Sequence, residues 1–320
     1  VHELRLVDIN APYPVPGDLP PGTPAQVAAT LGLPVSPSTN RPFPNQGDIY
    51  EYQSDGIFKQ NLLLINVNST IGWVTLFSRY SYGTAHTNTD GASTLTSDPY
   101  DFNADWGRSS LNIENNFFLG GSMMGPWGLR LSPFIILHSG VPFNLTTGND
   151  LFLQGQIGMT ARPAVVSSPG LYVVGTPYGY LNQYPVVPVP GSSAFIPLNE
   201  GTGPGFVGIN LRLSKTWGFG TTKFQGPSGG AHSGGGHWHG GGFGGFGVHG
   251  HRFSAETEHR YNLTLSINAR NILNHTNLST PIGVITSPKF LESNGITGGY
   301  SAENTSSENR RMDMQLRFTF

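Results

Sequence analysis

The last nine residues of the chain alternate between apolar and polar side chains without interruption, from Met312 to Phe320. A period of two places successive side chains on opposite faces of a strand. The same period recurs at residues 207–214 and 261–270. These three segments therefore predict strands that each have one apolar face and one polar face.

Weaker signals extend this strand-rich pattern along the chain. Further strands are predicted at residues 3–9, 48–54, 57–68, 71–83, 108–119, 128–138 and 141–147. Turns, which favour Gly and Asn, are predicted at Asn68-Ser69-Thr70, Gly120-Gly121, Ser139-Gly140 and Gly218-Phe219-Gly220. Only residues 23–31, with Pro24 near the start, have a helical signal. The pattern predicts an all-β fold in which antiparallel strands form an up-and-down meander.

Long polar stretches separate the predicted strands at residues 11–46, 84–106, 149–203, 221–258 and 278–309. Outer-membrane barrels combine long extracellular loops with short periplasmic turns, whereas such loops are rare in compact soluble domains. We therefore divide the chain into a Pro-rich loop or linker at 1–46 and a C-terminal barrel segment at 47–320. The second part includes a Gly/His-rich loop at 226–251.

Charged residues make up only 11% of the chain, against about 25% in soluble domains, so lipid, neighbouring subunits or sugars are expected to cover part of its surface. Near-neutral charge without a basic stripe argues against a nucleic-acid partner. No apolar run is long enough for a membrane helix. The opening Val1-His2-Glu3-Leu4 has no signal-like run, which suggests a processed or internal start.

Three arginines fall on the polar side of the predicted strands: Arg212, Arg270 and Arg317. An arginine facing mid-bilayer lipid costs about 2 to 4 kcal/mol, so we expect all three to face the lumen of a barrel. Open sheet edges cannot sit in hydrocarbon, which requires the barrel to close. The strands predicted here look like part of a larger, partial outer-membrane barrel.

Several segments resemble the C-terminal barrel of Oar-like TonB-dependent receptors, which carry a carboxypeptidase-regulatory-like N-terminal domain. The matching segments are residues 41–44, 49–54, 132–144, 200–206, 210–215, 268–277 and 309–311. The resemblance implies ligand capture by long loops, passage through the lumen, and energy supplied by a TonB-type transducer through an N-terminal part that is missing here. The terminal Phe320 and the alternating aromatics before it, including Phe318, resemble the signal read by the barrel assembly machinery. The alternative is an ordinary edge strand.

The Gly/His-rich loop offers candidate metal ligands, because neutral imidazole binds Zn, Cu and Ni. These histidines are His232, His237, His239, His249 and His251. The alternative is a solvated Gly-rich loop with no ligand function. Clustered carboxylates at Asp98, Asp101 and Asp105 suggest calcium, although their spacing is not that of an EF-hand.

Asn-x-Ser/Thr triplets, which accept glycans in secreted proteins, begin at Asn68, Asn144, Asn262, Asn274, Asn277 and Asn304. No catalytic motif is present, so we expect no enzymatic activity. The leading hypothesis is a receptor or transporter barrel in the outer membrane of a Gram-negative bacterium. The main alternative is a structural or adhesive cell-surface protein, such as a fibre subunit, that self-associates through its strand edges. The third hypothesis is a soluble β-sandwich that binds carbohydrate.

Overall fold

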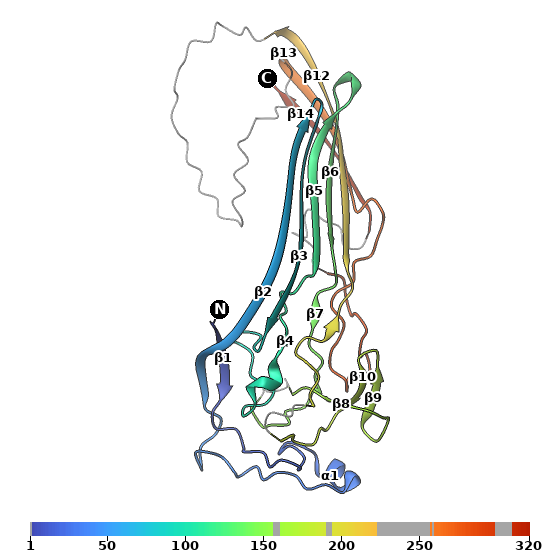
Figure 1. The fold of residues 1–320 in the computed structure, drawn as a ribbon. Helices are drawn as coiled ribbons and strands as arrows, with labels where there is room; N and C mark the ends of the chain where they lie inside the picture. Colours follow the sequence, from blue (N-terminus) through green and yellow to red (C-terminus); the bar gives the residue numbers. More distant parts are fainter. Residues whose placement is uncertain (1, 156–160, 190–193, 223–256, 258, 298–308) are drawn as a thin grey trace.

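The computed structural model describes residues 2–155, 161–189, 194–222, 257, 259–297 and 309–320. One large sheet dominates it, with strands in the order β1-β2-β3-β5-β6-β12-β13-β14 and with β4 paired to β3 (Figure 1). Its strands are β1 (His2–Asp8), β2 (Tyr50–Ile71), β3 (Val74–Thr87), β4 (Gly107–Arg108), β5 (Asn115–Met124), β6 (Leu129–His138), β12 (Phe206–Thr222), β13 (His259–Arg270) and β14 (Arg311–Thr319). Every pairing is antiparallel. The predicted all-β, up-and-down meander is confirmed.

Two smaller sheets and three short helical segments complete the regular structure in the described part of the chain. One small sheet contains β8 (Ala164–Val166), β10 (Gly179–Asn182) and β9 (Val173–Thr176), and the other pairs β7 (Pro142–Phe143) with β11 (Gly201–Thr202). The helical segments are α1 (Ala25–Leu31), η1 (Phe102–Asp105) and η2 (Pro126–Gly128). None of these helices has both the length and the apolar character needed to cross a membrane.

The three strongest periodic signals and two of the weaker ones gave correct strands. The segments predicted at 3–9, 128–138, 207–214, 261–270 and 312–320 correspond to β1, β6, β12, β13 and β14. The short helix predicted at 23–31 is α1, which ends at Gly32 in the left-handed conformation with φ of 68°. Glycine adopts this conformation without steric cost, so it ends the helix efficiently.

The first hairpin is longer than predicted. Residues 48–54 and 57–68 were expected to form two strands, but they belong to the continuous strand β2, which includes the predicted turn Asn68-Ser69-Thr70. The chain reverses instead at Gly72-Trp73, where Gly72 has a φ of 56°. Polar residues at 68–70 misled the prediction, because they pair with β3 rather than facing solvent in a turn.

The next hairpin shows a similar error. The Gly120-Gly121 pair, expected to be a turn, lies inside β5, and a Cβ atom on Gly120 would stand only 2.4 Å from the ring of Phe77. These glycines therefore provide space for cross-strand neighbours rather than reversing the chain. The reversal occurs at η2, where Trp127 has a φ of 58°. Gly218-Phe219-Gly220 likewise lies in β12 and is not a turn.

Two predicted strands are mostly irregular. In the segment 108–119 only the last part, from Asn115, is strand β5, because residues 109–114 form a turn in which Asn112 donates its backbone N–H to Ser109. In the segment 141–147 only Pro142–Phe143 is a strand, and it pairs with β11 outside the main sheet. Short apolar runs next to a sheet therefore do not always join it.

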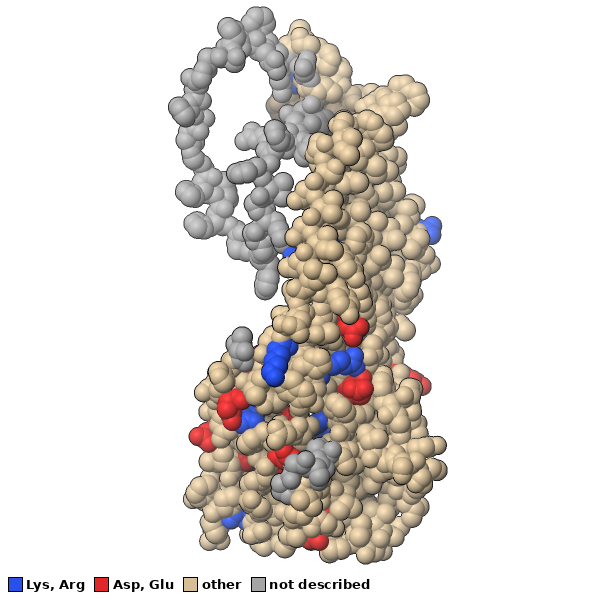
Figure 2. Space-filling view, in the orientation of Figure 1, with Lys and Arg blue, Asp and Glu red and all other residues tan. Residues whose placement is uncertain are grey.

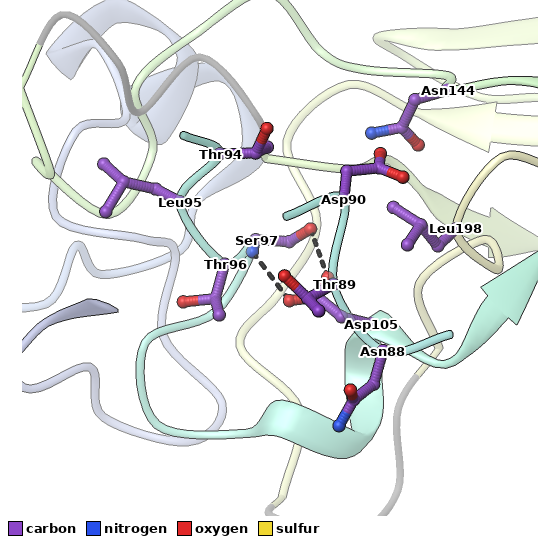
Figure 3. Close-up of a pocket in the computed structure, with 10 residues that line it drawn as sticks. All are labelled: Asn88, Thr89, Asp90, Thr94, Leu95, Thr96, Ser97, Asp105, Asn144 and Leu198. Carbon is purple, nitrogen blue, oxygen red and sulfur yellow. Dashed lines mark hydrogen bonds between the residues drawn. The ribbon is translucent and has the colours of Figure 1, made fainter. Parts of the chain in front are cut away.

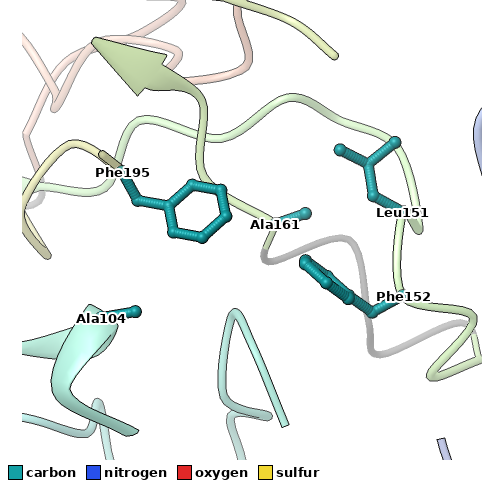
Figure 4. Close-up of a cluster of buried hydrophobic side chains, with 5 residues drawn as sticks. All are labelled: Ala104, Leu151, Phe152, Ala161 and Phe195. Atoms are coloured by element: carbon teal, nitrogen blue, oxygen red, sulfur yellow. The ribbon is translucent and has the colours of Figure 1, made fainter. Parts of the chain in front are cut away.

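The long polar stretches fold together into a packed body at one end of the sheet, which we call the cap (Figure 1). The cap consists of the described residues within 9–49, 88–114, 139–205 and 271–297. One of its hydrophobic clusters contains Ala104, Leu151, Phe152, Ala161 and Phe195 (Figure 4). A second contains Phe143, Leu145, Leu181, Ile196 and Ile285. The sequence predicted these stretches only as long polar loops, but their scattered apolar residues meet across segments far apart in sequence and form a core.

The connections divide unequally between the two ends of the sheet. The four long connections β1 to β2, β3 to β5, β6 to β12 and β13 to β14 leave and re-enter at the cap end. The short turns at 72–73 and 125–128 lie at the other end, which we call the turn end. Strand β12 ends and β13 begins at this turn end too. The connection 221–258 was predicted as one of the long loops. Its flanking strands, β12 and β13, show that it leaves and re-enters the sheet at the turn end, away from the cap.

Candidate functional site

The main sheet has two chemically distinct faces, and its register assigns each residue to one of them. On the polar face, Arg212 lies opposite Asn268 and Ser132, and Ser214 lies opposite Ser266 and Arg130. Side-chain hydrogen bonds connect these strands. For example, the Arg212 guanidinium donates to Ser266 Oγ at 3.0 Å. We call this surface, from β2 to β14, the polar face.

The opposite surface, which we call the apolar face, is continuous and open to the surroundings. Leu213 lies opposite Ile267 and Leu131, and Ile267 lies opposite Met314. Met314 is 77% exposed. In Figure 2 the visible surface over the strands shows few charged residues, which gather instead on the cap. Large exposed apolar patches of this kind mark a surface that another apolar medium covers.

All three arginines expected to face a lumen lie on the polar face. Arg270 forms an ion pair with Asp313 at 2.9 Å, and Arg317 lies opposite Thr264. Arg79, Arg130 and Arg311, which were not singled out from sequence, share the same face by register. Their positions could have been found by extending the period-two pattern to β3, β6 and the first residue of β14.

Aromatic rings gather at the turn end of the apolar face. Phe219 stacks on Tyr261 at 5.8 Å between ring centroids, Tyr261 on Phe318 at 6.1 Å, and Phe318 lies 6.0 Å from Phe320. Trp217 lies opposite Leu263 on the same face. Such a belt is typical of strands that cross the interface between lipid and water. The two residues expected to carry the assembly signal, Phe318 and Phe320, belong to this belt.

The sheet is open in the part of the chain that the structure describes. Strand β1 covers the outer edge of β2 only as far as Ile57, and within the described residues no strand pairs with the outer edge of β14. Beyond Phe58, no strand among the described residues pairs with the outer edge of β2. Closure of a barrel requires partners for both edges.

The cap is held together by a buried arginine. Arg162 is fully buried and donates to Asp105 Oδ1 at 2.8 Å, to Ser97 Oγ at 2.8 Å, and to the carbonyl oxygens of Ile196 and Ala104. Burial lowers the pKa of Arg162, while the negative charge of Asp105 opposes that shift. One side chain thus connects η1, the segment before it and the segment around Ile196.

The neighbouring carboxylates are satisfied by backbone groups. Asp98 accepts the N–H of Tyr100 at 2.8 Å, and Asp101 accepts that of Asn103 at 3.1 Å, while Asp105 binds Arg162. Across the described residues, no three His, Cys, Asp or Glu side chains are arranged to hold a metal ion. The geometry gives the calcium interpretation no support, because the oxygens of this cluster cap turns and neutralise the arginine.

A small polar pocket lies beside this network (Figure 3). Its lining includes Asp90, Asp105 and Asn144, and Asp90 accepts a bond from Asn199 Nδ2 at 2.9 Å. Burial raises the pKa of Asp90, and the hydrogen bond from Asn199 opposes the shift. The pocket is thus a polar recess inside the cap rather than an open binding cleft.

The buried carboxyl of Asp98 makes the stability of the cap depend on pH. Burial raises its pKa from 3.8 to about 6, so the folded cap holds a proton that the unfolded chain has lost between those values. Stability therefore falls as pH rises from about 4 to about 6, by at most about 3 kcal/mol. We expect Asp98→Asn to flatten this dependence and to protect cap amides from hydrogen exchange at pH 7.5. An unchanged pH profile would contradict this.

Two other groups of sequence-predicted sites give different outcomes. The five candidate metal-binding histidines lie outside the described residues, as does Asn304. Asn262 and Asn277 are buried, with their side chains bonded to His259 and Val207 respectively, so neither is accessible to a glycosylating enzyme. Asn68 is exposed within β2 on the polar face.

Comparison with known families agrees with this geometry. Residues 1–226 match the model of a family described as an outer membrane beta barrel domain. That match covers more than two thirds of the chain, so the chain belongs to this family. It is an outer-membrane protein, and its apolar face meets the lipid bilayer. No curated protein and no solved structure matches the chain. The soluble β-sandwich interpretation is wrong.

Proposed function

We propose that this chain forms part of the transport barrel of an Oar-like TonB-dependent receptor. The observation that supports the proposal best is a polar face that runs from the turn end of the sheet to a packed cap. Polar side chains are unfavourable in contact with lipid, whereas along an aqueous path they can form hydrogen bonds with a solute that crosses the membrane. The cap would capture the ligand, and the polar face would line its path.

The arrangement of the connections suggests an orientation. Long loops of outer-membrane barrels are extracellular and short turns periplasmic, which places the cap outside the cell. Phe318 and Phe320 would then meet the barrel assembly machinery at the periplasmic side. A TonB-type transducer would act from that side. We propose no catalytic role for the chain.

Uptake measurements in the native organism test this proposal. A strain that lacks the gene and its complemented counterpart would be compared for uptake of labelled ferric siderophores, cobalamin and oligosaccharides. We expect the deletion to abolish uptake of at least one probe, and a protonophore to abolish the same uptake in the complemented strain. Equal uptake of every probe by both strains would overturn the proposal.

A second candidate function rests on the open edges of β2 and β14. Unpaired strands favour edge-to-edge association, so copies of this chain could assemble into a structural or adhesive surface fibre. Electron microscopy of protein released without detergent distinguishes the two functions. Regular filaments would support the fibre, while single particles found only in detergent micelles would exclude it.

A further inference from the structure

A cluster of basic and aromatic side chains lies on the apolar face at the cap end of the main sheet. Lys59 in β2 lies opposite His86 in β3, which lies opposite Arg108 in β4, so the three side chains share one face. The Trp106 and His86 rings stack with 6.1 Å between their centroids, and Lys59 Nζ lies 5.3 Å from the Trp106 centroid. We call Lys59, His86, Trp106 and Arg108 the rim cluster.

The apolar face of β2 and β3 changes from basic to apolar in the direction away from the cap. Beyond the pair of Lys59 and His86, the facing pairs are Asn61 with Thr84, Leu63 with Tyr82, Ile65 with Tyr80, and Val67 with Ser78. Aromatic rings such as Tyr80 and Tyr82 are typical of the interface between lipid and water. In a strand tilted by about 45°, the four residues from Leu63 to Lys59 rise about 9 Å along the membrane normal. The rim cluster therefore lies at the level of the lipid headgroups.

Lys59 and Arg108 retain their positive charges, because no acidic side chain in the described part of the chain forms an ion pair with either. Arg108 is partly exposed and donates to the Thr202 hydroxyl at 3.0 Å and to the carbonyl oxygens of Glu200 and Gly201. All three acceptors are neutral. These bonds occupy three of the five N–H donors of the guanidinium, so two remain for a ligand.

We propose that the rim cluster binds an anionic lipid of the outer leaflet through a phosphate group in the lipid headgroup. Guanidinium and ammonium groups donate charged hydrogen bonds to phosphate oxygens. The acyl chains of the same lipid would lie along Leu63 and Ile65, which continue on the same face. A soluble anion would lack that second contact. The choice of leaflet rests on the proposed function, because that proposal places the cap outside the cell.

Native mass spectrometry of the full chain in uncharged detergent tests the site, with bisphosphorylated lipid A as the probe. We expect the wild type to retain one lipid A molecule, and to retain zwitterionic dioleoylphosphatidylcholine at least about tenfold less. The combined substitutions Lys59→Gln and Arg108→Gln should weaken lipid A binding at least about tenfold, the loss expected for one charged hydrogen bond. Should this variant fail to fold, Lys59→Gln alone replaces it, because Lys59 is exposed. Its loss should be smaller but should still exceed that of the control.

Lys215→Gln is the matched control, because Lys215 also lies on the apolar face beside a tryptophan, with its Nζ 5.2 Å from the Trp217 centroid. Lys215 lies near the turn end, and its cross-strand neighbours are Leu129 and Leu265. This variant should retain lipid A like the wild type. Absence of lipid A from the wild type, an equal loss in the control, equal retention of phosphatidylcholine, or displacement of lipid A by equimolar inorganic phosphate would each overturn the proposal.

A second measurement separates the site from the orientation on which the choice of leaflet rests. The chain has no cysteine, so Ser38→Cys places a single thiol at an exposed position of the cap. A membrane-impermeant maleimide should label this thiol in intact cells. Labelling only after lysis would overturn the orientation and the outer-leaflet assignment, whereas lipid A binding in detergent does not depend on orientation. Uptake unaffected by gene deletion would overturn the transport function alone.

Discussion

Replacement of Arg162 by alanine should unfold the cap while the main sheet stays paired. The substitution leaves the carboxylate of Asp105 buried without its charged partner and deprives two buried carbonyl oxygens of a donor. Loss of one partner from a buried ion pair costs about 3–5 kcal/mol. Hydrogen exchange measured by mass spectrometry should show loss of protection in the cap and retained protection in β5, β6 and β12.

A double variant separates the effect of charge from the effect of lost volume. Arg162→Met combined with Asp105→Leu removes both charges and keeps apolar bulk, so it should recover much of the protection. Equal loss in the single and double variants would show that packing, rather than the unpaired charge, holds the cap. Full protection in the single variant would contradict the role assigned to Arg162.

The strands of the main sheet could be predicted because one physical requirement acts on them at every second residue. Lipid on one side and polar surroundings on the other enforce alternation, which is visible in β12, β13 and β14 without any knowledge of their neighbours. The same alternation placed Arg212, Arg270 and Arg317 correctly on the polar face.

The cap could not be predicted, because its stability depends on contacts between distant segments. Arg162 binds groups at positions 97, 104, 105 and 196, and nothing in its local sequence distinguishes it from a surface arginine. Ala104 and Leu151 pack in one cluster, although Ala104 lies in the connection from β3 to β5 and Leu151 in the connection from β6 to β12. The turn predicted at Gly120-Gly121 was wrong for a related reason. Gly120 leaves room for the ring of Phe77 on a neighbouring strand, a contact that depends on the fold.

Two adjacent substitutions in β2 should differ sharply in their effect on membrane insertion. Val67 lies on the apolar face opposite Ser78, and Asn68 lies on the polar face opposite Phe77. Both side chains are exposed, so either position can accept an arginine without a steric clash. Val67→Arg places its charge against lipid and should destabilise the inserted protein by about 2–4 kcal/mol, whereas Asn68→Arg should change stability by less than about 1 kcal/mol.

Urea titration of the protein folded into phosphatidylcholine vesicles measures the difference, with the folded fraction read from its electrophoretic mobility without heating. The two variants introduce the same side chain at neighbouring positions of one strand. A loss of stability shared by both therefore reflects strand propensity, and the difference between them shows which face contacts lipid. Equal midpoints would contradict the assignment of the two faces. A lower midpoint for Asn68→Arg would place lipid on the polar face and would remove the basis for a solute path along that face.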